Sequence, residues 1–195
     1  MCIRDSSEGI IVNKRKGNWY IYEPNDVWKT IKQKSPSNKI GENILELLLD
    51  LSYKRHGALI IFCEDCNLSE CVVDKSSIIE CIESSHLHKL LAPKIKEICI
   101  TCPDVKDISK PLILELASID GAIIFDKDTG NIKAFGAMII SHKDVSEKGA
   151  RSMAAMSAVK NNMIPFKVSS DGDITIYHEH FDTSGQSEII KINFL

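Results

Sequence analysis

The feature that most constrains the fold is an unbroken apolar run over residues 58–62, Ala-Leu-Ile-Ile-Phe. The run has the length of a β-strand, and its lack of polar positions indicates that both faces of this strand are buried. A second buried strand is predicted over residues 120–125, where apolar residues follow an Asp-Gly pair. Such strands need a covering layer on each side, so the chain is expected to form an α/β domain.

Four segments between the predicted strands carry apolar residues at helical spacing. They span residues 42–55, 76–91, 110–118 and 149–160, and a shorter helix capped by Asp26 is predicted up to Ile31. Pro93 lies just beyond the second segment, and Ser109 is suited to cap the N-terminus of the third. The fourth segment is rich in Ala and Met, which favours helix and allows close packing.

Hairpins are interleaved with these helices. One is predicted over residues 9–23, and another over 166–177 with its turn at Asp171-Gly172. A turn at residues 128–131 should pair the strand 120–125 antiparallel with a strand over 132–140. Short strands at 72–73 and 95–102, a polar loop at 64–70 and an edge strand at 189–194 complete the prediction. Helices alternating with hairpins predict a mixed central sheet rather than a purely parallel one.

The chain length of 195 residues allows one well-packed domain but not a second full core. We expect residues 1–41 to form an N-terminal hairpin with a connecting segment, and residues 42–178 to form the main domain. Residues 179–195 should form a tail that contains the edge strand. Residues 1–6 fit no pattern, and one interpretation is that they are not native to the protein.

Composition excludes several classes of partner. A net charge of −3 gives no reason to expect a long nucleic acid or an anionic membrane as partner. No apolar run approaches the roughly 20 residues that a membrane span requires, and no segment has the apolar core of a secretory signal. Seven cysteines are an odd count, and several lie within apolar patterns. Buried thiols in a reducing compartment are therefore favoured, and the cytoplasm is the predicted location.

Two patterns offer an alternative as metal sites. The pairs Cys63/Cys66 and Cys99/Cys102 have the spacing of two zinc knuckles. The second pair, however, lies in a strand-like stretch that lacks the turn residues of a knuckle. Neighbouring histidines also occur, His178 with His180 and His86 with His88, and ordinary surface or hydrogen-bonded roles are the simpler interpretation for them.

Two short pieces of the chain carry groups suited to a nucleotide. Asp120 and Gly121 begin a predicted strand, and a carboxylate there can hold Mg²⁺. Lys148, Gly149 and Arg151 begin a predicted helix, whose free N–H groups attract anions and whose guanidinium can bind two phosphate oxygens. The alternative is that the Asp-Gly pair only forms a turn, and that the helix start only caps and packs.

Both pieces resemble motifs of one family. Residues 116–124, Leu-Ala-Ser-Ile-Asp-Gly-Ala-Ile-Ile, are similar to the Asp-Gly-Ala segment of the DisA-type diadenylate cyclase (DAC) domain. Residues 149–155, Gly-Ala-Arg-Ser-Met-Ala-Ala, align with that family's second motif, Gly-Thr-Arg-His-Arg-x-Ala. Residues 55–61 resemble its Gly-Ala-Leu-Ile strand, and the hairpin ending at residue 177 falls where the family has one. The resemblance covers about residues 42–178.

The resemblance implies a mixed sheet of about seven strands flanked by helices, and an activity. The family condenses two ATP molecules into cyclic di-AMP, with two domains face to face. Asp120 would then bind Mg²⁺ or Mn²⁺ and help to activate the attacking 3′-hydroxyl, and Arg151 would hold phosphate as a second catalytic residue. The implied nucleotide-binding residues are Asp120, Gly121, Ala122, Lys148, Gly149, Ala150, Arg151 and Ser152.

The second motif departs from the family pattern, because Ala150, Ser152 and Met153 replace its Thr, His and second Arg. Each lost charge-assisted contact costs about 1.5–3 kcal/mol, so losing two or three lowers turnover by several orders of magnitude. The leading hypothesis is therefore an adenine-nucleotide-binding sensor or degenerate relative, which signals to an attached effector domain or partner. An active diadenylate cyclase is the alternative, and a ligand-free interaction domain is the second alternative. A homodimer or higher oligomer is compatible with each.

Overall fold

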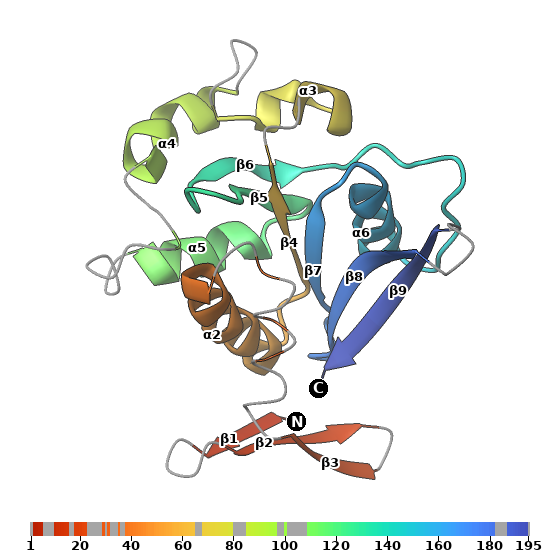
Figure 1. Cartoon of the computed structure of the whole chain (residues 1–195). Coiled ribbons are helices and arrows are strands. Elements are labelled where there is room, and N and C mark those ends of the chain that lie inside the picture. The colour runs from red at the N-terminus through yellow and green to blue at the C-terminus, as the bar shows by residue number, and fades with distance from the viewer. Residues whose placement is uncertain are drawn as a thin grey trace.

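The centre of the molecule is a six-stranded mixed sheet in the order β6-β5-β4-β7-β8-β9 (Figure 1). The computed structural model describes residues 2–5, 10–15, 18–22, 29, 31, 35, 38–64, 68–79, 85–96, 100, 109–181 and 187–194. The strands are β4 (Ala58–Cys63), β5 (Ala122–Asp126), β6 (Ile132–Ala137), β7 (Ile164–Val168), β8 (Ile174–Phe181) and β9 (Ser187–Phe194). β4 and β5 are parallel, and the other neighbouring pairs are antiparallel. The predicted α/β class and mixed sheet are confirmed, with six strands rather than about seven.

The apolar run over residues 58–62 lies within β4, at the middle of this sheet. Its even-numbered residues, such as Ile60 and Phe62, belong to one buried core, and its odd-numbered residues, such as Leu59 and Ile61, belong to a second core on the other face. Side chains alternate between the two faces of a strand, so a strand covered on both sides needs apolar residues throughout.

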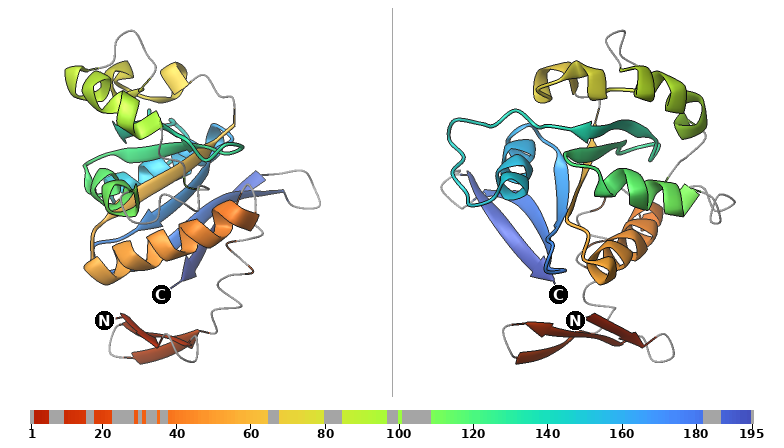
Figure 2. Two further views of the ribbon diagram at one scale, coloured as in Figure 1. Left: turned by 90° about the vertical axis from the view of Figure 1, so that its left-hand side faces the viewer. Right: turned by 180° about the vertical axis from the view of Figure 1, so that it is seen from behind.

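Helices cover both faces of the sheet. α2 (Asn38–Lys54) and α5 (Ser109–Ser118) lie on one face, and α6 (Ala150–Lys160) lies on the other (Figures 1 and 2). α2 begins at Asn38 rather than at residue 42, because Ile40 is fully buried and extends the apolar stripe of the helix by one turn. α5 and α6 agree with the predicted helices to within one residue.

The chain between β4 and α5 runs beside β6 and differs most from the prediction. It contains α3 (Leu68–Cys71), the 3₁₀ turn η1 (Lys75–Ser77) and α4 (His86–Lys96). Single bridges join Val72 to Ile139 and Ile78 to Ala134. α3 thus occupies part of the predicted polar loop, and the helix predicted over 76–91 is wrong at residues 76–79, while residues 80–84 lie outside the described residues.

The Asp74 carboxylate explains this difference, because it accepts hydrogen bonds from the N–H and hydroxyl of Ser76 and closes a tight turn there. α4 begins only after Ser85, whose hydroxyl accepts from the His88 N–H. The helix then continues through Pro93 to Lys96, so Ile95 is helical and the strand predicted over 95–102 is wrong at its start. Residues 97–99 and 101–108 lie outside the described residues.

The N-terminal segment forms its own antiparallel sheet of β1 (Cys2–Asp5), β2 (Ile10–Arg15) and β3 (Asn18–Tyr22). The hairpin predicted over 9–23 is confirmed as β2 and β3. β1 lies within residues 1–6, for which no structure was predicted. The short helix capped by Asp26 falls mostly on residues outside the described set. Within the described residues, no helix is both long and apolar enough to cross a membrane.

Candidate functional site

Asp120 lies in the turn that leads from α5 into β5. α5 ends at Ser118, whose hydroxyl donates to the Leu114 carbonyl at 2.7 Å. The Asp120 side chain is exposed, and its Oδ1 accepts a hydrogen bond from the Gly121 N–H at 3.1 Å. This local bond fixes the carboxylate at the start of β5 while leaving it open to solvent. A ligand can therefore reach it.

Gly121 is required by the fold itself. Its φ of +105° belongs to the region that favours glycine, and an added Cβ would lie 2.5 Å from the carbonyl carbon of Gly136 on β6. The next residue, Ala122, is buried and pairs with Ala137. The close approach of two strands thus explains the Gly-Ala pair, and these two residues alone do not indicate a ligand.

Arg151 reaches from the first turn of α6 to the start of β4. A Cβ added to Gly57 would lie 2.7 Å from Nη1 of Arg151, so the guanidinium lies directly against this glycine. β4 and β5 are parallel and pair in register from Ile60 with Ile123, so Gly57 and Asp120, which come just before the two strands, lie at the same end of them. Arg151 and Asp120 therefore lie at the same end of the two central strands.

The charge of Arg151 is not neutralised within the described part of the protein. Its Nε is buried without a hydrogen-bond partner, and no carboxylate among the described residues forms an ion pair with it. A guanidinium remains charged at all physiological pH values, and a buried donor without a partner is costly. An incoming anion would supply the missing acceptors.

The first turn of α6 adds backbone donors to this cation. Gly149 is the N-cap with a φ of +95°, and no side chain caps the helix or places an acidic group in its first turn. Lys148, Gly149 and Ala150 are exposed. The first N–H groups of a helix have no partner within the helix and carry partial positive charge, so this end attracts an anion.

Ser152, like Ala122, is a buried member of the predicted set. Its hydroxyl accepts a hydrogen bond from Nζ of Lys167 at 2.9 Å. Lys167 lies on β7, and its ammonium is 5.9 Å from the centre of the Tyr177 ring. The sequence prediction missed Lys167. A single lysine between two apolar residues of a strand indicates a charged group with a specific partner, and this signal could have found it.

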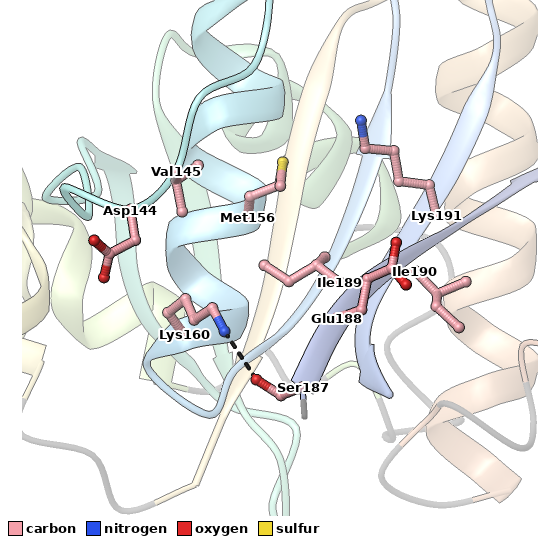
Figure 3. Close-up of a pocket in the computed structure, with 9 residues that line it drawn as sticks. All are labelled: Asp144, Val145, Met156, Lys160, Ser187, Glu188, Ile189, Ile190 and Lys191. Atoms are coloured by element: carbon pink, nitrogen blue, oxygen red, sulfur yellow. Dashed lines mark hydrogen bonds between the residues drawn. The ribbon is translucent and has the colours of Figure 1, made fainter. Parts of the chain in front are cut away.

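A cavity of about 670 Å³ lies between α6 and β9, and none of the predicted site residues lines it (Figure 3). Its lining consists of Asp144, Val145, Met156, Lys160, Ser187, Glu188, Ile189, Ile190 and Lys191. Both lysines already have acidic partners, since Lys160 pairs with Glu179 and Lys191 with Glu147. The hydrogen bond from Lys191 lowers the pKa of the Glu147 carboxyl.

Asp120 is the one predicted metal ligand, and no group of three or more His, Cys, Asp or Glu side chains gathers among the described residues. This donor set suits Mg²⁺, which binds through one or two carboxylates, several waters and the phosphates of a nucleotide. It does not suit zinc. Cys63 is a buried thiol, whereas Cys66, Cys99 and Cys102 lie outside the described residues.

The histidine pairs have the structural roles that the sequence favoured. The ring of His88 is buried, stacks on Phe135, and bonds the Ser85 hydroxyl through Nδ1 and the Phe135 carbonyl through Nε2. His86 is exposed. On β8, Nδ1 of His178 bonds the Glu179 carbonyl at 3.2 Å, and His180 is exposed.

Comparison with known proteins identifies the fold family. Residues 48–181, well over half of the chain, match the family described as DAC, DisA bacterial checkpoint controller nucleotide-binding. A hypothetical membrane spanning protein from Bacillus cereus is 17% identical over 78% of this chain, with a TM-score of 0.48, and this chain spans 63% of its length. A double mutant of DacA from Staphylococcus aureus is 20% identical over 85% of this chain and 88% of its own, with a TM-score of 0.41. No curated protein is significantly similar in sequence. By its family match, the chain belongs to the DAC family of DisA-type nucleotide-binding domains.

Proposed function

We propose that this DAC domain binds ATP or a related adenine nucleotide at the sheet end shared by Asp120 and Arg151, as a sensor or degenerate relative of a cyclase. The observation that carries the proposal is the guanidinium of Arg151. It lies against Gly57, at the same end of the two central strands as Asp120, and its buried Nε has no partner. A phosphate group is an acceptor of the right charge and geometry for it.

In this proposal each predicted residue has a role. Arg151, together with the N–H groups of residues 149–152 at the start of α6, would hold the phosphates. Asp120 would hold Mg²⁺ or Mn²⁺, which would offset the charge that develops on a phosphate during transfer. Gly121 and Ala122 would line the nucleotide through their backbone, and the exposed Lys148 would add positive charge at the rim.

Two side chains favour nucleotide binding over efficient turnover. Ser152 is buried and already bonded to Lys167, and the Met153 sulfur accepts a contact from the Ser141 hydroxyl at 3.8 Å. These positions carry His and Arg in the family motif, so two groups that would stabilise transition-state charge are replaced here. Each such contact is worth about 1.5–3 kcal/mol. A domain that binds a nucleotide without converting it rapidly would act as a sensor. It would signal through an attached domain or a partner.

An active diadenylate cyclase is the second candidate, and Lys167 is the observation that favours it. Its ammonium lies 2.9 Å from the Ser152 hydroxyl, so a cation is present near the position where the family motif has a histidine. Such a cyclase would need two domains face to face, and the product would be cyclic di-AMP.

Calorimetry with ATP and Mg²⁺ tests the first proposal. The wild-type domain should bind, and Asp120→Asn should weaken the metal-dependent part of the affinity. Asp128→Asn is a matched control, because Asp128 is also exposed but lies in the turn at the other end of β5. The proposal fails if the wild type shows no heat of binding, or if both variants weaken binding equally.

One assay distinguishes the two candidate functions, the sensor and the cyclase. Incubation with ATP and Mg²⁺ or Mn²⁺, followed by chromatography for cyclic di-AMP, should yield little or no product from a sensor. Turnover that depends on Asp120 and on protein concentration would instead identify a cyclase that works as a dimer.

A further inference from the structure

We propose that Lys167 is a second phosphate-binding cation of this site, held in position by Ser152. The site would then recognise a polyphosphate chain through Arg151 and Lys167 together. The identity of the ligand as a nucleotide rests on the proposed function, whereas the polyphosphate contact can be tested without it.

The strand register brings the two cations to the same face of the sheet. Lys167 on β7 pairs with Leu59 on β4, and Gly57, against which Arg151 lies, is two residues before Leu59. Residues two apart on a strand point to the same face. Ser152 follows Arg151 in the first turn of α6 and accepts the hydrogen bond from Lys167. The two cations thus flank the same helix start.

The direct contacts of Lys167 are with uncharged groups, and the one acidic group in the described part of the chain that senses its charge is Glu147, whose pKa is lowered by the hydrogen bond from Lys191 and, in addition, by Lys167. The uncharged groups are the Ser152 hydroxyl and the face of the Tyr177 ring, and no carboxylate within the described ranges forms an ion pair with Lys167. Lys191 offers a direct contrast, because its ammonium is also 5.9 Å from the Tyr177 ring but is paired with Glu147. Glu147 is therefore already engaged. A half-buried ammonium that bonds a neutral hydroxyl, and whose neighbouring carboxylate is already paired with another lysine, favours the arrival of an anion.

The chemistry of the two cations suits a chain of phosphates rather than a single carboxylate. A guanidinium binds two oxygens in one plane, whereas an ammonium acts as a compact point charge with three donors. A triphosphate presents several oxygens along its length, so it can contact both groups and the backbone N–H groups of α6 at once. A carboxylate has two oxygens and cannot serve all three.

Calorimetry with inorganic tripolyphosphate and with ATP, each with Mg²⁺, tests this proposal on three variants. Lys167→Met keeps most of the length of the side chain but removes its charge, and it should weaken the binding of both ligands about tenfold or more. Lys133→Met is the matched control. Lys133 is also a partly exposed lysine on a strand, but it forms an ion pair with Asp126 at the end of β5 opposite to the candidate site. The affinity of Lys133→Met for both ligands should therefore stay within about twofold of wild type. Ser152→Ala keeps the charge and removes only its anchor, and it should weaken tripolyphosphate by a smaller factor.

The outcomes separate this inference from the proposed function. If Lys167→Met binds ATP and tripolyphosphate as tightly as wild type does, the role of Lys167 is overturned while nucleotide binding stands. A second outcome is that tripolyphosphate binds in a Lys167-dependent manner, while ATP binds no more tightly than tripolyphosphate and adenosine does not compete with ATP. In that case the polyphosphate site stands and the nucleotide function fails. If the wild type binds neither ligand, both fail. Should Lys167→Met lower the melting temperature strongly, Ser152→Ala decides the question by the same readout.

Discussion

Two glycines at the same end of the sheet make room for different groups, one for a side chain and the other for a neighbouring strand. An added Cβ at Gly57 would meet the tip of the Arg151 side chain, whereas one at Gly121 would meet the backbone of Gly136 and Ala137. A flexible side chain can move aside, but a paired strand cannot. Gly57 therefore serves the position of Arg151, and Gly121 serves the packing of β5 against β6.

This contrast predicts opposite effects for two substitutions. Gly57→Ala should leave the free energy of unfolding within about 1 kcal/mol of wild type, because its φ is not in the glycine region. It should nevertheless weaken ATP binding, since the guanidinium must shift. Gly121→Ala should cost roughly 2 kcal/mol or more, because its φ is +105° and its Cβ would clash with backbone. Urea denaturation and calorimetry measure the two effects. Equal loss of stability in both variants would contradict the assignment.

At the level of residues, the sequence indicated where two members of the candidate site would lie. Asp120 and Arg151 lie at one end of the central strands, which their places at the starts of a strand and a helix already suggested. Ser152 belongs to the predicted nucleotide-binding set, and its hydroxyl is buried against Lys167. That contact depends on the register of β7 against β4, which is set by long-range pairing and not by any local pattern.

At the scale of elements, prediction succeeded where the local pattern and the tertiary contacts agreed. The three hairpins and the helices α5 and α6 carry strong turn or helix signals, and all of them are present. The segment before α4 failed because Ile78 has helical spacing but forms a bridge with Ala134 on β6. Tertiary pairing thus overrode a moderate local preference for helix.

One hydrogen bond ties α2 to the turn between β7 and β8. The Ser52 hydroxyl donates to the Gly172 carbonyl at 2.6 Å, and both groups are buried. Ser52→Ala should cost about 1–3 kcal/mol, because it leaves a buried carbonyl without its partner. Ser118→Ala is the matched control, since its hydroxyl bonds a carbonyl four residues earlier in its own helix. Urea denaturation should show a clearly smaller loss for Ser118→Ala, and an equal loss would show that the bond to Gly172 is not special.

Two ion pairs tether the outer strands to α6 and its preceding loop. Lys191 bonds Glu147 and lowers the pKa of that carboxyl from its ordinary value of 4.5. Ser187 and Lys160 bond Glu179 and lower its pKa in the same way. A lowered pKa in the folded state means that the stabilisation is present above pH 4.5 and is lost as the pH falls through the folded pKa. Thermal melts should therefore show stability declining below pH 4.5.

The double variant Glu147→Gln/Glu179→Gln should flatten this decline, because the neutral amides do not titrate. Both carboxylates are partly exposed, so the effect should shrink at high salt. A double variant that retains the full wild-type pH dependence would assign the decline to other carboxylates. Asp126, which accepts hydrogen bonds from Thr129 and has a lowered pKa, would then be the next group to test.

At the scale of the whole molecule, the position of the candidate site follows from the mixture of strand directions. Ligands of open α/β sheets usually bind beyond the carboxyl ends of parallel strands. Here β4 and β5 start at the end of the sheet where antiparallel β7 finishes. The first turn of α6 lies against this same end of the sheet (Figure 1). The helix N-terminus and its cations, rather than the carboxyl ends of the parallel strands, therefore favour this end for an anion.

The competing location for a ligand is the cavity between α6 and β9, and hydrogen exchange can distinguish the two. ATP with Mg²⁺ at 100 times its Kd should stabilise the folded domain by about 2.7 kcal/mol. The added protection should concentrate at the amides of Gly121 and Ala122 and in the first turn of α6, because those groups would contact the nucleotide. The amides of β9 beside the cavity should change only as much as the global stability does. Strong local protection of β9, with none at Gly121 or in the first turn of α6, would place the nucleotide in the cavity. It would also remove Arg151 from the binding site.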